Sequence, residues 1–265
     1  MSSPVIQTRS GSVLHLTLSR PKRRNAMNIP MVHAIRDAFV DLEQTKDVRA
    51  VVIRGAEGHF CAGGDIAEMA GALLQPPSDG QDPLATLNRS FGEMLQVVEA
   101  SRAVTIAICE GGVMGGGFGL ACVADVTLAV SGARFRLPET GLGIPPAQIA
   151  PFVVRRIGLS QARRLGLTGA KVSAEEAVQI GLAHATVTAE QVDDWLAETL
   201  TAVRRCEPDA VAATKQLMLR TAALDLGPLL DQAAAEFAAI ARAPTAMAGF
   251  QAFMGRSAPP WAEEG

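Results

Sequence analysis

A glycine-rich stretch between residues 109 and 130, CEGGVMGGGFGLACVADVTLAV, places the strongest constraint on how this chain can fold. An apolar run that includes Val104 and residues 106–108 precedes it and predicts a buried strand. Three consecutive glycines, 115–117, come next, and the apolar series 118–124 predicts a short buried helix. Consecutive glycines let the backbone pass close to another group and orient its N–H groups freely. The stretch therefore predicts a strand, a glycine turn and a helix N-terminus.

Such a turn has two interpretations: it can bind an anion, or it can allow close packing of a core helix on a sheet. This stretch alone does not distinguish between them. The unpaired N–H groups and the positive dipole end of a helix N-terminus favour a phosphate or a developing oxyanion. The chain contains a second unit of the same kind, because the β-branched run 48–53 leads to Gly63-Gly64-Asp65 and a helical start. Two such units would provide two sets of free N–H groups that one site could share.

Length, composition and charge narrow the class of protein. The 265 residues suit one large domain, or one domain with an appendage, and 48% hydrophobic residues can build a sizeable core. The net charge of -3, without a long basic block, argues against nucleic acid as the main partner. The four cysteines and four histidines stand apart, which predicts reduced core cysteines and no metal site. Without a signal pattern, and with Asp125 in the one long apolar run, the chain is expected to be cytoplasmic and outside the membrane.

Alternating apolar segments predict an α/β fold with parallel strands. Residues 5–9 and 13–18 predict a hairpin, and Asn28 is a candidate N-cap for the next helix. A helix is expected over 84–100, and strands over 104–109 and 126–130. Residues 71–83 are rich in Pro, Gly and Asp and predict a mobile surface loop. Ser173 and Glu176 predict a capping box at the start of a helix. From about residue 195 onward, the chain is predicted to form a series of helices.

Four segments of the chain together resemble the crotonase, or enoyl-CoA hydratase/isomerase, superfamily. HFCAGGDIAEM at 59–69 and GGVMGGGFGLACVADV at 111–126 are similar to the two oxyanion-hole segments of that family. RPKRRNAMN at 20–28 is similar to its CoA-binding loop, and FRLPETGLGIPP at 135–146 to the segment that carries a catalytic glutamate. The four segments follow the order and approximate spacing of the family, so the resemblance covers nearly the whole chain.

The resemblance implies a crotonase-like core of stacked ββα spiral turns, expected over residues 1–195, and a helical C-terminal trimerisation region over 196–265. It implies a homotrimer, or a dimer of trimers. The substrate would be an acyl-CoA thioester. No metal or separate cofactor is implied, because CoA would arrive as part of the substrate.

The resemblance also assigns roles to individual residues. The backbone N–H groups of Gly64 and Gly116 would hold the thioester oxygen, and Glu139 would be the catalytic acid or base. The residues expected along the CoA are Arg24, Ala26, Ala62, Asp65 and Ile66, with Lys22 and Arg23 near its phosphates. Without the resemblance, the cations Lys22, Arg23 and Arg24 would indicate only a solvated loop. Asp65 would then be interpreted as a helix N-cap, and Glu139 as an acidic residue in a surface loop.

One position departs from the family pattern. Hydratases of the best-known type carry a further glutamate three residues after the position of Gly116, where this chain has Gly119. This departure resembles the branch that hydrates branched glutaconyl-CoA esters, whose extra carboxylate would need a cation or an amide donor; Gln148, Arg155 and Arg156 are candidates. A Δ3,Δ2-enoyl-CoA isomerase and a CoA-ester-binding protein with little catalysis are the alternatives. A dinucleotide-binding motif is excluded, because Cys122 stands where the last glycine is needed.

Overall fold

The computed structural model describes residues 3–45, 47–78 and 80–262. Its strands are β1 (Val5–Ser10), β2 (Val13–Leu18), β3 (Ala50–Gly55), β4 (Val104–Cys109), β5 (Gly112–Met114), β6 (Val126–Val130), β7 (Arg134–Arg136), β8 (Lys171–Ser173) and β9 (Ala185–Val187). Its α-helices are α1 (Ile29–Leu42), α2 (Ile66–Leu73), α3 (Pro83–Ala100), α4 (Gly116–Val123), α5 (Ala150–Thr168), α6 (Ala174–Gln179), α7 (Val192–Arg204), α8 (Pro208–Arg220), α9 (Leu226–Ala241) and α10 (Pro244–Met254). The short 3-10 helices are η1 (Pro21–Arg23), η2 (Ala56–Gly58), η3 (Glu139–Leu142) and η4 (Ala189–Gln191).

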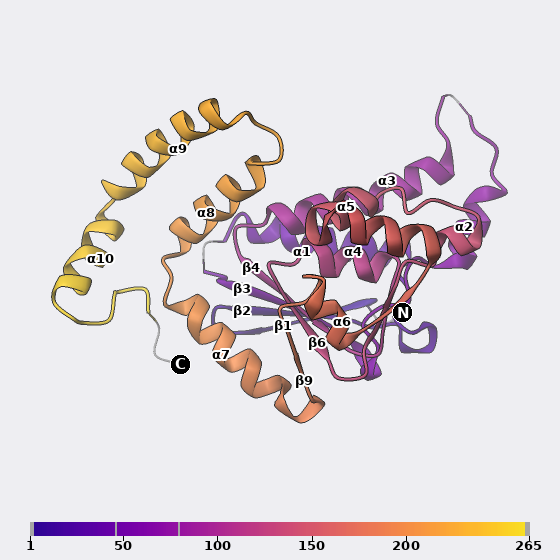
Figure 1. Cartoon of the computed structure of the whole chain (residues 1–265), viewed down its shortest axis with the longest axis horizontal. Helices are drawn as coiled ribbons and strands as arrows, with labels where there is room; N and C mark the ends of the chain where they lie inside the picture. Colours follow the sequence, from indigo (N-terminus) through magenta and orange to yellow (C-terminus); the bar gives the residue numbers. More distant parts are fainter. Residues whose placement is uncertain (1–2, 46, 79, 263–265) are drawn as a thin grey trace.

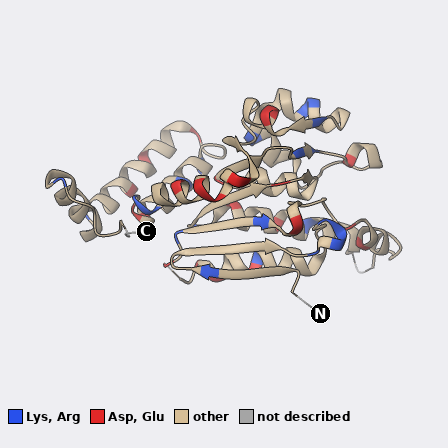
Figure 2. Ribbon diagram, turned by 90° about the horizontal axis from the view of Figure 1, so that it is seen from below, with Lys and Arg blue, Asp and Glu red and all other residues tan. Residues whose placement is uncertain are grey.

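Two sheets organise the core. The larger sheet has the strand order β1-β2-β3-β4-β6-β9, with an antiparallel β1–β2 pair and parallel pairs elsewhere; the smaller has the order β5-β7-β8. The charged residues in Figure 2 lie mostly on helices and loops, while β4 and β6 carry none. Parallel strands covered on both faces are expected to be apolar in this way.

Both faces of the larger sheet are buried, by different helices (Figure 1). Because successive side chains of a strand point to opposite faces, Val51 and Ile53 of β3 pack toward α1, α3 and α4, while Ala50 and Val52 pack toward α7. The result is a three-layer α/β arrangement.

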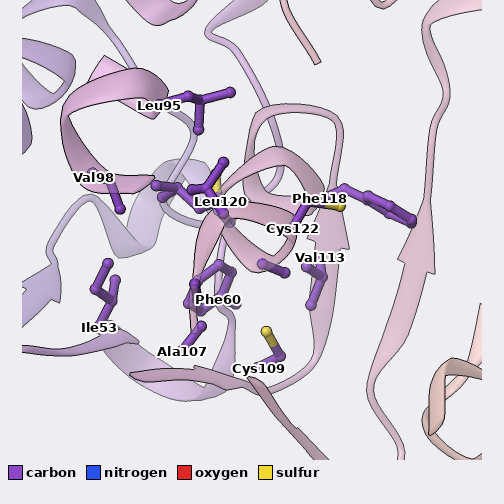
Figure 3. Packing of buried hydrophobic residues seen from close by; sticks show 14 of the residues in the cluster. Ile53, Phe60, Leu95, Val98, Ala107, Cys109, Val113, Phe118, Leu120 and Cys122 are labelled. Carbon is purple, nitrogen blue, oxygen red and sulfur yellow. The ribbon is translucent and has the colours of Figure 1, made fainter. Parts of the chain in front are cut away.

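Helix α4 lies at the centre of the core, and every one of its residues is buried. Phe118 and Leu120 of this helix lie among Phe60, Val113 and Leu95 (Figure 3). A helix that is apolar on all sides is stable only in such a position. The N-terminus of α4 is therefore held rigidly by the packing around it.

The structure confirms several predicted elements. The β1–β2 hairpin forms, Asn28 caps α1 by accepting a hydrogen bond from the Met31 N–H, and the helix and strands predicted over 84–130 are present. The chain from α7 through α10 is helical in its described part. No helix of the described residues is long and apolar enough to span a bilayer.

Three local predictions need correction. Helix α2 continues to Leu73, so the expected loop at 71–83 begins only after the last turn of that helix and ends at the N-cap of α3. Ser173 caps α6, but the Glu176 side chain pairs with Arg164 instead of completing a capping box. Cys206 is exposed rather than part of the core, whereas the other three cysteines are buried.

Candidate active site

A cleft of about 460 Å³ opens where α2, α3, the N-terminus of α4 and the segment before α5 meet. Most of its wall is apolar, with Val32, Leu84, Phe91, Ile144 and Ile149 among the lining residues. Gly64, Gly116 and Glu139 also line it, so the structure brings together the two glycines and the carboxyl group that the sequence singled out.

The two glycine turns meet at this cleft. The Met27 N–H donates to the Gly63 carbonyl at 2.8 Å and the Asp65 N–H to the Met27 carbonyl at 2.8 Å, so these pairings leave the Gly64 N–H unused. The N-cap of α4 is Gly115, which has a φ of 47° and no side chain to cap the helix. Within the described residues, neither the Gly64 nor the Gly116 N–H donates to an acceptor. Both are therefore available to an oxygen bound in the cleft.

Close approach explains why glycine is needed at these turns. A Cβ on Gly63 would lie 3.3 Å from the Met114 carbonyl oxygen, and one on Gly116 would lie 3.1 Å from the Phe91 ring. Side chains there would push the two turns apart or displace the ring from the cleft wall. The glycines thus bring two backbone donors to one site.

Glu139 opens η3 and lies directly beside the N-cap of α4. Its Oε1 is 2.7 Å from the point where a Cβ on Gly115 would be. Its Oε2 is buried and has no hydrogen-bond partner among the described residues. Burial raises the pKa of the Glu139 carboxyl above its usual value, because the charged form loses its hydration. A carboxyl group with a raised pKa and a free oxygen can exchange a proton with a bound molecule.

The position of the missing glutamate is filled by apolar side chains. A Cβ on Gly119 would lie 3.3 Å from Ile149 Cγ2 and 3.3 Å from Leu95 Cδ1. The glycine therefore allows close packing of α4 against its neighbours, and Glu139 has no second carboxyl beside it at this position.

The predicted CoA-binding residues divide into two groups. Ala62, Asp65 and Ile66 line the cleft. Arg24 and Ala26 do not line it but lie in the adjoining loop, where the Ala62 N–H donates to the Arg24 carbonyl at 3.0 Å. The same loop contains η1 and its cations Lys22 and Arg23.

The sequence analysis missed the partner of Asp65. Arg20 donates from Nη2 to Asp65 Oδ2 at 2.7 Å and from Nη1 to the Ala26 carbonyl at 2.5 Å. Asp65 also caps α2, as predicted, by accepting hydrogen bonds from the Ala67 and Glu68 N–H groups. The arginine thus ties the loop at 20–28 to the first glycine turn; its place within a cluster of cations in the sequence gave no signal of this pairing.

Of the three residues proposed to meet a substrate carboxylate, only Gln148 lines the cleft. Arg155 pairs with Glu99 at 2.8 Å, and Arg156 donates to the Leu182 carbonyl at 3.1 Å and the Ala124 carbonyl at 3.2 Å. Both arginines lie outside this cleft, and among the residues that the structure describes no Lys or Arg lines it.

An α/β core with two sheets, two backbone donors in one cleft and one half-buried carboxyl define a protein of the crotonase type. The family model described as enoyl-CoA hydratase/isomerase matches residues 8–264. The chain is 30% identical over 258 residues to the 2,3-dehydroadipyl-CoA hydratase of Escherichia coli K12, covering 97% of this chain and 98% of that protein. This protein therefore belongs to the enoyl-CoA hydratase/isomerase family and is an enzyme of that family.

Solved structures agree with this assignment. An enoyl-CoA hydratase/isomerase from Marinobacter aquaeolei superposes with a TM-score of 0.95 at 50% identity, covering 99% of this chain and 100% of that one. Pseudomonas aeruginosa AtuE superposes with a TM-score of 0.94 at 48% identity, covering 98% and 100%. Two further curated hydratases align over 67% and 66% of their own length.

Proposed function

We propose that this enzyme adds water to the double bond of a 2-enoyl-CoA thioester. The observation that carries the proposal is the presence of the unused Gly64 and Gly116 N–H groups in the same cleft as the half-buried Glu139 carboxyl, whose Oε2 has no partner in the described structure. Attack of water on the β-carbon places negative charge on the thioester oxygen. Two fixed donors stabilise this charge, each by about 3 kcal/mol in comparable sites.

Glu139 would both take and return a proton. In its ionised form it removes a proton from the attacking water, and the same carboxyl then protonates the α-carbon. Arg24, Ala26, Ala62, Asp65 and Ile66 would hold the CoA, with Lys22 and Arg23 near its phosphates. A homotrimer, or a dimer of trimers, is the proposed assembly.

For the acyl group we propose a branched glutaconyl chain. The similarity to an enzyme named for 2,3-dehydroadipyl-CoA, also a thioester of a dicarboxylic acid, supports a second carboxylate. The apolar wall of the cleft supports a branched or extended carbon chain.

A Δ3,Δ2-enoyl-CoA isomerase is the second candidate, and the packing at Gly119 favours it. Ile149 and Leu95 occupy the space of a further glutamate, so one carboxyl group serves the site. Moving one proton along an acyl chain requires only one acid/base group.

A Glu139→Gln variant tests the proposal. We expect hydration of crotonyl-CoA and 3-methylglutaconyl-CoA, followed by loss of the enoyl thioester absorbance, to fall by about 10²–10⁴-fold. Glu198→Gln, a change at an exposed position on α7, should leave hydration unchanged and serves as the control. Undiminished hydration by Glu139→Gln would contradict the assigned role. Conversion of a 3-enoyl-CoA to its conjugated isomer, without hydration, would favour the isomerase.

A further inference from the structure

The half-buried side chain of Gln148 is an unpaired amide in a mostly apolar cleft wall. Gln148 lines the cleft, yet it makes no hydrogen bond with any other described residue. A half-buried amide without partners loses hydration and gains nothing in return. An amide kept in this state is suited to a polar group on a bound molecule.

The surface of α3 is shaped to receive this side chain. A Cβ on Gly92 would lie only 1.9 Å from Gln148 Oε1, so any larger residue at that position would displace the amide. Gly92 stands in the interior of α3, where glycine is unfavourable to the helix by roughly 0.5–1 kcal/mol relative to alanine. The glycine therefore provides space for Gln148 at a position where helix stability favours a larger residue.

A cation lies behind the amide. A Cβ on Gly92 would lie 2.9 Å from Arg89 Nη1 and 1.9 Å from Gln148 Oε1. The guanidinium group and the amide oxygen therefore lie over the same part of α3. A guanidinium group has only hydrogen-bond donors, so the amide oxygen faces it favourably. With its oxygen on this side, the Gln148 amide can turn its NH₂ group, which is a donor, toward the cleft.

We propose that Gln148, packed over the open surface of Gly92 and close to the Arg89 guanidinium, binds a carboxylate oxygen on the acyl chain of the substrate. The inference rests on the proposed acyl-CoA function and assigns the residue that distinguishes a dicarboxylic acyl group from a plain one. In this proposal Gln148 contacts the substrate, Gly92 is a positioning residue that makes room for the amide, and Arg89 contributes nearby positive charge.

Three of the four acidic residues that line the cleft already have partners within the protein, which lessens their repulsion of an anionic acyl group. Asp65 pairs with Arg20, Glu68 accepts a hydrogen bond from the Ile29 N–H at 2.8 Å, and Asp82 caps α3. The Arg89 guanidinium, whose Nη1 lies close to the same surface of Gly92 as Gln148 Oε1, adds positive charge beside the amide.

Binding of two saturated thioesters tests the inference without requiring catalysis. Isothermal titration calorimetry would compare glutaryl-CoA, which carries the extra carboxylate, with hexanoyl-CoA, which does not. We expect Gln148→Met and Gly92→Ala each to lower the affinity for glutaryl-CoA by about tenfold, and to change that for hexanoyl-CoA by less than about twofold. Arg89→Met should give a smaller loss that shrinks as salt is added, because Arg89 is largely exposed.

Two matched variants separate this effect from general damage. Gly166→Ala makes the same change inside α5, where a Cβ would meet no atom within 4 Å, and Gln44→Met removes an exposed amide after α1. Neither should alter the binding of either thioester. Equal losses for both thioesters in Gln148→Met, or an unchanged affinity for glutaryl-CoA, would overturn the inference.

The proposed function can fail separately. Selective loss of glutaryl-CoA binding in a protein that hydrates no enoyl-CoA would support the inference and contradict the hydratase proposal. A wild-type protein that binds neither thioester would contradict both.

Discussion

At the scale of single residues, the environment of Glu139 determines how the enzyme should respond to pH. Burial raises the pKa of this carboxyl, and its Oε2 has no partner in the described structure that would favour ionisation. A general base works only when ionised, so kcat/KM for hydration should fall as the pH drops through the raised pKa of Glu139. We expect this acidic limb above the ordinary glutamate value of 4.5.

The measurement is a profile of kcat/KM for crotonyl-CoA from acidic to neutral pH. Folding must be monitored in the same buffers, so that loss of structure is not mistaken for protonation. A limb at or below the ordinary glutamate value would contradict the link between the burial of Glu139 and its pKa.

Gly119 leads to a prediction about replacing the missing glutamate. A Gly119→Glu side chain would have to pass Ile149 and Leu95, each 3.3 Å from its Cβ. We expect a loss of about 3 kcal/mol or more in the free energy of unfolding, because a carboxyl is buried without partners, and no gain in hydration rate.

Denaturant unfolding and the crotonyl-CoA assay check this prediction together. Gly119→Ala, which adds only a methyl group, is the control and should cost less than about 1.5 kcal/mol. The additional change Ile149→Ala should recover part of the stability, since it makes room for the carboxyl. A stable and faster Gly119→Glu enzyme would show that the packing does not exclude the second glutamate.

At the scale of elements, Arg49 joins the sheet to the C-terminal helices. It precedes β3, is only 8% exposed, and donates to the Val203 and Arg204 carbonyls at the end of α7, each at 3.1 Å. It also donates to the Cys206 carbonyl and, at 2.9 Å, to that of Trp261. A cation at a helix C-terminus satisfies carbonyls that lack partners and interacts favourably with the helix dipole.

Arg49→Met should therefore loosen the attachment of α8–α10. We expect a loss of about 2–4 kcal/mol in the free energy of unfolding and faster hydrogen exchange at the end of α7. Arg36→Met, which removes a partly exposed arginine paired with the exposed Asp37, should cost less than about 0.5 kcal/mol. Equal effects of the two substitutions would contradict the role given to Arg49.

The comparison of sequence and structure shows which elements can be predicted from their own residues alone. Strand β4, the glycines 115–117 and the buried helix α4 were predictable, because period, length and glycine spacing are local properties. The three-residue strands β5, β8 and β9 were not, since their pairing depends on segments far away in the chain. The same holds for Arg20 with Asp65 and for Arg155 and Arg156, whose partners the linear sequence does not reveal.

At the scale of the whole molecule, the chain has a covered core and an exposed C-terminal arm of helices α8–α10. Figure 1 shows this arm extending away from the sheet. Several of its large apolar side chains are open to solvent, with Phe237 71% exposed and Phe253 85% exposed. An apolar surface of this kind is typical of a protein–protein contact.

The proposed homotrimer, or dimer of trimers, would cover this arm. Replacing Phe237 and Phe253 by serine should therefore shift the protein toward monomer, because the association loses the burial of two aromatic side chains, about 1.5–3 kcal/mol each. Light scattering coupled to size-exclusion chromatography, over a range of protein concentrations, measures the change. Leu74→Ser, at a position 84% exposed after α2 and away from the arm, should leave the assembly intact. A wild-type chain that is monomeric at every concentration, or an arm variant that stays fully assembled, would show that α9 and α10 do not hold the subunits together.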